Sequence, residues 1–167
     1  MTALSVNLNK IALMRNSRLS GIPSVTEAAR VALEHGADGI TVHPRPDLRH
    51  IRPDDVYGLA NLVQQNPGAE FNIEGNPFAT PIGDFPGFLS LVEATRPDQC
   101  TLVPDNNDQL TSDHGFDLHK SGEKLAPVIA HLQSLGIRVS LFMDPDIDQI
   151  TRAKKVGADR IELYTGP

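Results

Sequence analysis

The amino-acid sequence predicts an α/β fold, a (β/α)8 TIM barrel of which the first six strands are represented. Short runs rich in apolar and β-branched residues alternate with amphipathic helical patterns, which is typical of buried parallel strands joined by helices. A helix end, a tight turn and a strand also recur, most clearly at 36–43 and 157–164. A complete barrel usually takes about 250 residues. The chain has 167 residues, so we expect one incomplete barrel domain over 1–167, with a doubly wound open sheet as the alternative.

Six strands are expected, and the second is the best defined. Ile40 and Val42 favour a buried strand because β-branched side chains pack well on a pleated surface, whereas Pro44 and Pro46 cannot continue a central strand. This strand therefore ends near His43. By the same reasoning the six strands are 4–8, 39–43, 70–74, 100–103, 138–142 and 160–164.

The first predicted helix follows Ser24, which forms a capping box with Glu27, and it ends at Gly36. Its inward face is expected to comprise Ala28, Val31, Ala32 and His35. A second helix begins at Pro53, because proline fits the first turn and the two following aspartates lie near the positive end of the helix dipole. Further helices are expected to begin near Pro86, Ser121 and Asp146.

Composition restricts the class of protein. With 40% hydrophobic residues the chain can bury a real core, and its formal net charge of -6 argues against a general surface for nucleic acid or anionic membranes. Cys100 is the single cysteine, which excludes a disulfide within the chain. The sequence contains neither an apolar run near the roughly 20 residues that span a bilayer nor the N-terminal pattern of a signal peptide. We therefore expect a cytoplasmic protein with no nucleic-acid or membrane partner.

A cluster of imidazole and guanidinium groups follows the second strand, within 39–50. His43 and His50 are expected to exchange protons near neutral pH, and three nearby arginines, Arg45 among them, can hold phosphate or carboxylate through paired hydrogen bonds. Catalytic groups of α/β enzymes gather at the carboxyl ends of strands. Because the whole chain is acidic, this local basic cluster favours a small anionic ligand. The alternative is a solvated basic loop with a structural histidine.

Other strand ends are polar as well. In a barrel the carboxyl ends of successive strands meet on one face, so these residues form one constellation. Glu74 follows an apolar strand and is expected to be a partly buried carboxyl with a raised pKa, able to accept or donate a proton. The alternative is a strand-end carboxylate paired with a lysine or arginine. The constellation comprises Asn7, Asn9, Lys10, His43, Arg45, Glu74, Asp105, Asn106, Asp144, Glu162 and Tyr164.

Metal and cofactor chemistry is not predicted. His43, His50 and Glu74 can be imagined as zinc ligands, but the sequence lacks the spacing of zinc motifs and the nearby arginines would repel a cation. The run 105–108 lacks the glycine and glutamate of a calcium loop. A dinucleotide fingerprint and a serine nucleophile elbow are also missing from the sequence. The remaining histidines of the polar loop and helix, His114, His119 and His131, are expected to be exposed.

Eight motifs resemble one known family. They are 5–12, 15–18, 36–45, 49–51, 72–74, 102–104, 139–142 and 161–166. Together they resemble the pyridoxine 5'-phosphate synthase family of vitamin B6 biosynthesis, and the block 43–50 is the most specific part. The resemblance implies a homo-oligomeric, octameric (β/α)8 barrel without a cofactor. The implied reaction condenses 3-amino-2-oxopropyl phosphate with 1-deoxy-D-xylulose 5-phosphate to pyridoxine 5'-phosphate by general acid-base catalysis, with release of phosphate and water.

The same resemblance implies roles for individual residues. His43 and Glu74 would be general bases, and Glu162 would stabilise the transition states. The amino-ketone phosphate would be held by Asn7 and Arg18, and the pentulose phosphate by Arg45, His50 and Thr111. The expected partners are therefore small phosphorylated substrates.

The sequence departs from the family pattern in three places. Asn9 and Lys10 stand where many members have aspartate and histidine, so an amide and an ammonium replace a carboxylate and an imidazole. Both are still candidate substrate contacts, since Lys10 can meet a phosphate. The family's last histidine and its main phosphate-binding turns are expected beyond residue 167, so residues 1–167 alone are expected to be inactive. Extra, proline-rich length at 75–87 is expected to form a different lid or subunit contact.

Two other functions stay open from the sequence. One is another phosphosugar barrel enzyme, such as an aldolase, epimerase or isomerase, which would share the arginines and the acid-base groups at strand ends. The other is a non-catalytic barrel remnant that binds phosphate. Formation of pyridoxine 5'-phosphate distinguishes the synthase from both.

Overall fold

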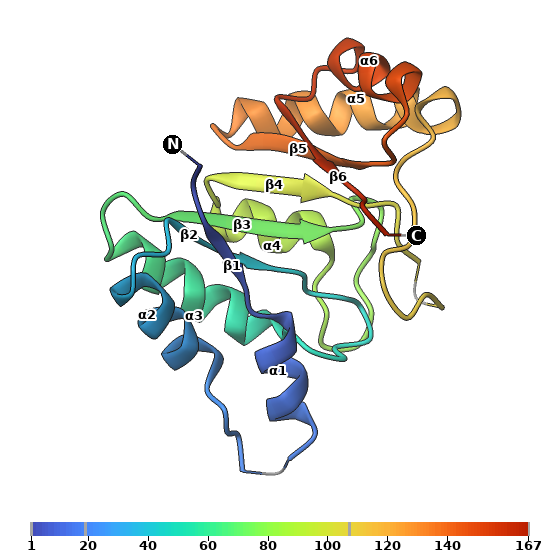
Figure 1. Cartoon of the computed structure of the whole chain (residues 1–167). Coiled ribbons are helices and arrows are strands. Elements are labelled where there is room, and N and C mark those ends of the chain that lie inside the picture. Colours follow the sequence, from blue (N-terminus) through green and yellow to red (C-terminus); the bar gives the residue numbers. More distant parts are fainter. Residues whose placement is uncertain (1, 19, 107, 167) are drawn as a thin grey trace.

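The computed structural model describes residues 2–18, 20–106 and 108–166, and its centre is one sheet of parallel strands (Figure 1). The strands lie in the sheet in chain order, each hydrogen-bonded to the next. They are β1 (Ser5–Asn7), β2 (Gly39–Val42), β3 (Glu70–Gly75), β4 (Gln99–Leu102), β5 (Arg138–Met143) and β6 (Arg160–Leu163). A doubly wound sheet reverses its strand order at a switch point. The barrel-type prediction is therefore confirmed and the open-sheet alternative is wrong.

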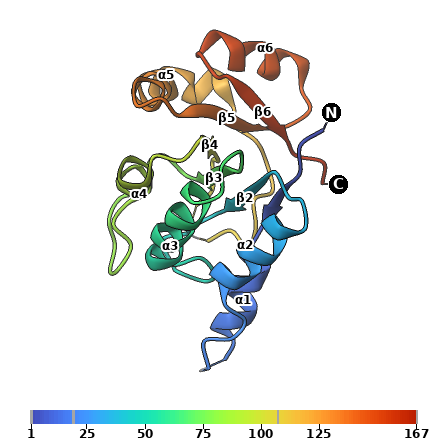
Figure 2. The same cartoon turned by 90° about the vertical axis from the view of Figure 1, so that its left-hand side faces the viewer.

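The helices lie around the outside of the curled sheet and leave its inner face open, as in half of a barrel (Figure 2). They are α1 (Asn9–Asn16), α2 (Val25–Glu34), α3 (Pro53–Gln64), α4 (Phe88–Thr95), α5 (Leu118–Ser134) and α6 (Ile147–Lys155). Within the described residues, none of these helices is both long and apolar enough to cross a membrane.

Most predicted element boundaries lie within two residues of the observed ones. The helix that begins at Pro53 is confirmed, and Asp146 caps α6 by accepting a hydrogen bond from the backbone N–H of Gln149. The start of α5 was predicted three residues too late, because Asp117 is its N-cap and accepts from the N–H of His119. Local capping chemistry, which sequence patterns show only in part, decides these starts.

The helix α1 was not predicted, and the predicted face of α2 is correct only in part. In α1 only Ala12 is fully buried and Leu8 at the N-cap offers no side-chain hydrogen bond, so neither periodicity nor capping marks it. In α2 the buried residues are Val25 and Ala29, and the predicted Ala28 and Ala32 pack against the core as expected. The predicted Val31 is 45% exposed, so the centre of the inward face lies about one position away from the predicted one.

The two faces of the sheet differ in polarity. Apolar residues such as Ile40, Ile73 and Leu141 are fully buried in the core with the outer helices. The residues between them are polar, including Thr41, Asn72 and Ser140. Because strand side chains alternate between faces, the inward face is polar along its length. At the carboxyl ends of the strands, its polar residues lie next to the polar residues of the loops that follow.

Candidate active site

A cavity of about 600 Å³ lies at the carboxyl edge of the sheet and gathers most of the predicted site residues. All of the predicted site residues except Arg18 line it: Asn7, Asn9, Lys10, His43, Arg45, His50, Glu74, Thr111 and Glu162. These come from β1, α1, β3, β6 and the loops after β2 and β4. Arg18 is exposed just after α1 and does not line the cavity.

His43 is a buried imidazole at the end of β2. Its backbone N–H donates to Asn9 Oδ1 at 2.9 Å, so Asn9 fixes the point at which the chain leaves the strand. Burial, and next the positive charge of Arg45, lower the pKa of His43 to about 3. The same two causes lower the pKa of His50 to about 4. Both imidazoles are therefore neutral at pH 7, and the predicted exchange of protons near neutrality is wrong for the chain by itself.

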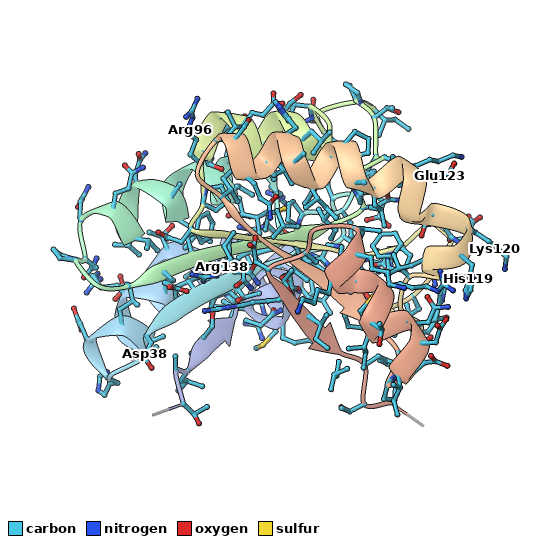
Figure 3. All side chains as sticks on the ribbon, turned by 90° about the horizontal axis from the view of Figure 1, so that it is seen from above. Asp38, Arg96, His119, Lys120, Glu123 and Arg138 are labelled. Carbon is cyan, nitrogen blue, oxygen red and sulfur yellow. The ribbon has the colours of Figure 1, made fainter. Side chains whose placement is uncertain are left out.

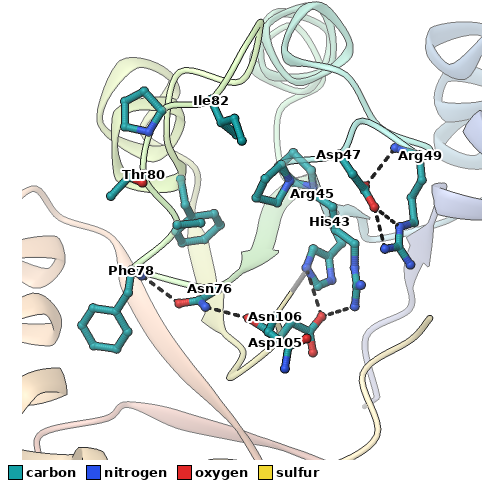
Figure 4. A pocket seen from close by; sticks show the side chains of 15 residues that line it. His43, Arg45, Asp47, Arg49, Asn76, Phe78, Thr80, Ile82, Asp105 and Asn106 are labelled. Atoms are coloured by element: carbon teal, nitrogen blue, oxygen red, sulfur yellow. Dashed lines mark hydrogen bonds and ion pairs between the residues drawn. The ribbon is translucent and has the colours of Figure 1, made fainter. Parts of the chain in front are cut away.

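Arg45 is also buried, at 5% exposure, which excludes the solvated-loop alternative. Its guanidinium donates through Nη1 to the carbonyl of Gln109 at 2.7 Å. Through Nη2 it donates to the Asp105 carboxylate (Figure 4). Asp105 Oδ2 also accepts from Ser112 Oγ at 2.9 Å. Arg45 and Asp105 thus fasten together the loops after β2 and β4, and this fixes the segment that carries Thr111.

Glu74 and Glu162 form a pair of carboxyl groups inside the cavity. Burial, then repulsion by Glu162 and a hydrogen bond with it, raise the pKa of Glu74 well above its ordinary value. Burial also raises the pKa of Glu162, although its hydrogen bond with Glu74 acts in the opposite direction. Two close carboxylates do not both ionise readily. Both carboxyls therefore hold their protons to a higher pH than an ordinary glutamate, and the pKa of Glu74 is the more strongly raised of the two.

The raised pKa predicted for Glu74 is confirmed, and the lysine or arginine partner is not observed. Among the described residues, its side-chain partners are Glu162 and Asn7, whose Nδ2 lies 3.5 Å from Glu74 Oε2. Asn7 Oδ1 accepts from the N–H of Asn9 at 2.9 Å. Asn7 is therefore held by the chain turn that leads into α1 and points its amide group at the carboxyl pair.

Side chains of α1 fix the loop after β2, residues 43–52, which we call the arginine loop. Asn16 Nδ2 donates to the carbonyl groups of Leu48, Arg49 and His50, at 3.3, 3.1 and 2.8 Å. Arg15 donates to the His50 carbonyl at 3.0 Å and pairs with a carboxylate at the start of α3. Leu48 has a φ of 56°, a conformation that non-glycine residues rarely adopt. The motif 15–18 was noted only through the resemblance, so these positioning contacts were missed by residue-level reasoning.

A second cavity of about 360 Å³ lies next to Arg45 and Asp105, between the loop after β2 and the extra segment 75–87 (Figure 4). Phe78 and Ile82 line it from the extra segment. Asn76 Nδ2 donates to the Asp105 carbonyl at 2.6 Å and so connects this segment to the site. Its predicted role as a lid or subunit contact stays a prediction.

Several other polar residues do not belong to the site. Asp144 accepts a hydrogen bond from the N–H of Gly115 at 3.0 Å and therefore anchors a loop. The predicted exposure of His114, His119 and His131 is confirmed, and Figure 3 shows His119 on the outer surface of α5. In the described part of the chain, no group of three or more His, Cys, Asp or Glu side chains is arranged to hold a metal ion.

Fold and cavity together define the class: a parallel βα half-barrel with a carboxyl pair, neutral imidazoles and buried guanidinium at the carboxyl ends of its strands. A family model described as "Pyridoxal phosphate biosynthesis protein PdxJ" matches residues 4–167. The chain belongs to this family, which confirms the resemblance seen in the sequence.

Similar curated proteins carry the name "Pyridoxine 5'-phosphate synthase". Those of Xanthomonas campestris pv. campestris (strain B100) and Xanthomonas axonopodis pv. citri (strain 306) are each 60% identical over 166 residues. That of Xylella fastidiosa (strain M12) is 56% identical over the same length. The alignments cover 99% of this chain but 64% of the length of the strain B100 relative, so the chain spans less than two thirds of it.

Proposed function

We propose that this chain forms the acid-base and pentulose-binding part of a pyridoxine 5'-phosphate synthase. The reaction would condense 3-amino-2-oxopropyl phosphate with 1-deoxy-D-xylulose 5-phosphate and release phosphate and water. The observation that carries the proposal is the Glu74–Glu162 carboxyl pair, which shares a cavity with a neutral imidazole and a buried arginine. The names of the relatives and the family of the chain support the same activity.

In this proposal the carboxyl pair and His43 move protons. A ring-closing condensation needs repeated proton transfers, and two adjacent carboxyls with raised pKa values are suited to donate and accept protons. Glu74 acts as a general base in its ionised form. Glu162 stabilises the charge that develops in the transition states. His43 is neutral and has a free electron pair, so it serves as a second base.

The cationic and amide groups would bind the phosphates. Arg45 offers a planar fork of donors that suits a phosphate, and His50 and Thr111 line the same cavity. Lys10 also lines it and supplies a further charge, Asn7 holds the amino-ketone phosphate, and Asn9 is a further substrate contact. Arg18 lies outside the cavity, so its contact with the amino-ketone phosphate stays a prediction, as do the octameric assembly and the cytoplasmic location.

Product analysis of two proteins tests the function. One is the chain itself, and the other is a hybrid in which this chain replaces the aligned residues of the Xanthomonas campestris relative, to which it is 60% identical. We expect the hybrid to convert the two phosphates to pyridoxine 5'-phosphate. A folded hybrid that binds both phosphates but forms no pyridoxine 5'-phosphate would contradict the proposal. A product of aldol cleavage or epimerisation would identify another phosphosugar enzyme.

A further inference from the structure

Asp105 lies at the junction of the proton-transfer and phosphate-binding groups, although no role follows for it from the resemblance. Its side chain is 6% exposed. Oδ2 accepts from Arg45 and from Ser112, and it lies 3.6 Å from Nε2 of His43. Figure 4 shows the imidazole and the guanidinium facing the same carboxylate.

The carboxylate of Asp105 can also accept a further hydrogen bond. Among the described residues its Oδ1 is the buried side-chain atom without a hydrogen-bond partner. A buried acceptor without a donor is costly, and Nε2 of His43 lies 3.6 Å from the other oxygen, Oδ2, just outside hydrogen-bond distance. Hydrogen bonds between catalytic groups are often long before substrate binds and tighten afterwards. A small rotation of either side chain would therefore let His43 donate to Asp105.

We propose that Asp105 is a positioning residue for His43: its carboxylate accepts the Nε2 proton, orients the imidazole and stabilises the imidazolium that forms during turnover. In this arrangement Nδ1 carries the free electron pair. A proton removed from the substrate goes to Nδ1, and the electrons of the broken bond stay on the substrate. The carboxylate itself does not take up a proton, because its task is to hold one tautomer and to balance the new positive charge.

The other charged groups around His43 explain why such a carboxylate is needed. From the loop after β2, Arg45, Arg49 and His50 oppose a positive charge on the imidazole, and Asp47 favours it. Lys10 of α1 and Glu74 of β3 line the same cavity. In the chain alone Arg45 occupies Oδ2 of Asp105. A phosphate bound to Arg45 would offset the guanidinium charge and strengthen the interaction of the carboxylate with His43.

The tautomer of His43 tests the geometry without any assay of turnover. Long-range proton–nitrogen NMR of the chain distinguishes the Nε2–H and Nδ1–H forms, and loss of one signal set in His43→Gln assigns the residue. We expect the Nε2–H form in the wild type and a mixture of both forms in Asp105→Ala. Exposed His131 is the internal reference whose signals stay unchanged. An Nδ1–H form in the wild type, or the same tautomer in Asp105→Ala, would overturn the proposal.

Steady-state kinetics of the hybrid test whether the negative charge of Asp105 contributes to turnover. This experiment rests on the proposed function. Asp105→Asn keeps the shape and the acceptor but removes the charge. We expect it to lower kcat at least tenfold, part of the roughly 10²- to 10⁴-fold effect typical of general acid-base groups, without raising KM. Asp105→Glu should recover part of kcat, and Asp148→Asn on the exposed face of α6 is the matched control. A role limited to fastening loops predicts the opposite split, with KM raised and kcat kept, and would refute the charge argument.

The NMR experiment and the kinetic experiment can fail independently of each other. If a folded hybrid that binds both phosphates makes no product, the proposed function is refuted, whereas the tautomer of His43 in the chain still decides whether Asp105 orients it. If the hybrid is active but Asp105→Asn matches it in kcat, the function stands and the role of Asp105 is refuted. Circular dichroism of each variant shows whether the fold is kept.

Discussion

Two layers of the inward sheet face lie two residues apart on the same strands and differ in chemistry. The middle layer consists of Ser5, Thr41, Asn72 and Thr101. The edge layer, two residues further along β1, β2 and β3, consists of Asn7, His43 and Glu74. The middle layer contains neutral groups, whereas two of the three side chains in the edge layer can ionise.

Hydrogen bonding differs between the layers in the same way. In the middle layer the hydroxyls of Ser5 and Thr41 are 2.8 Å apart, Asn72 Nδ2 donates to Thr41 at 3.3 Å, and Thr101 Oγ1 donates to Asn72 Oδ1 at 3.1 Å. In the edge layer Asn7 reaches Glu74 only at 3.5 Å, and the pKa of His43 is depressed. Satisfied neutral pairs stabilise a fold, whereas crowded ionisable groups cost stability and are typical of functional sites.

The largest effect is expected from removing the acid of the edge layer. Glu74→Gln in the hybrid should lower turnover by roughly 10²- to 10⁴-fold, because the amide cannot transfer a proton. The matched control is Thr101→Val in the middle layer. That change should keep turnover but lower the free energy of unfolding by about 1–3 kcal/mol, because Asn72 loses its donor. Steady-state kinetics and urea unfolding of both variants check this, and equal loss of turnover in the two would remove the distinction between the layers.

The next effect concerns binding at the edge. Arg45→Ala should weaken binding of 1-deoxy-D-xylulose 5-phosphate by roughly 10- to 100-fold, since hydrogen bonds to a charged group contribute about 1.5–3 kcal/mol. Arg45→Lys should recover only part of the affinity, because an ammonium keeps the charge but not the planar fork. Isothermal titration calorimetry of the hybrid measures both, with Arg152→Ala on α6 as the control. Unchanged affinity in Arg45→Ala would exclude Arg45 as the phosphate contact.

A smaller effect is expected from Asn16, which fixes the arginine loop next to the edge layer. Asn16→Ala removes three hydrogen bonds to the carbonyls of the arginine loop. We expect KM for the pentulose phosphate to rise by roughly three- to tenfold, about 1 kcal/mol of lost positioning, with a smaller change in kcat. Asn66→Ala is the matched control, since Asn66 Nδ2 also donates to a main-chain carbonyl, that of Leu62 at 2.7 Å, but away from the cavity. An equal rise of KM in both variants would show a general loss of stability instead.

How far the sequence predicts this molecule differs between the strands and the site. Apolar runs such as that around Ile40 and Val42 predicted the strands, because burial of a sheet leaves a periodic trace in the sequence. The strand-end rule also brought His43, Glu74 and Glu162 to one cavity as expected. The pKa values of the histidines were harder to predict, because they depend on how deeply an imidazole is buried and on which charges surround it in three dimensions. Burial of His43, and next the positive charge of Arg45, reverse the expectation of titration near neutrality.

Contacts between loops that are distant in the sequence could not be predicted from it either. Asp105 appeared in the sequence as one polar strand-end residue among many, and its meeting with Arg45 spans 60 positions. Asn16 gave no signal of its own, because one side chain bonded to three consecutive carbonyls leaves no periodic pattern. Such contacts follow from the path of the loops, which neither hydrophobic periodicity nor turn residues determine.

The last expected effect, which needs no substrate, is the pH dependence of stability. Burial raises the pKa of Glu74 above its ordinary value of 4.5. A carboxyl with a raised folded pKa contributes stability that is fully present below the unfolded pKa and is lost as pH rises through the folded one. The wild-type chain should therefore lose stability from about pH 4.5 upward by as much as ~1.4 kcal/mol for each pH unit up to the folded pKa. Glu74→Gln carries no such loss.

The difference in stability between Glu74→Gln and the wild-type chain should thus grow in favour of the variant from pH 4 to pH 8. Thermal unfolding of both proteins across this range measures it, and the contributions of His43 and His50 largely cancel in the difference. Glu123→Gln on α5, where Glu123 lies on the surface (Figure 3), is the control and should give a difference that does not change with pH. A flat difference for Glu74→Gln as well would mean that Glu74 ionises at its ordinary pKa. The edge layer would then lack the raised carboxyl pKa that separates it from the middle layer.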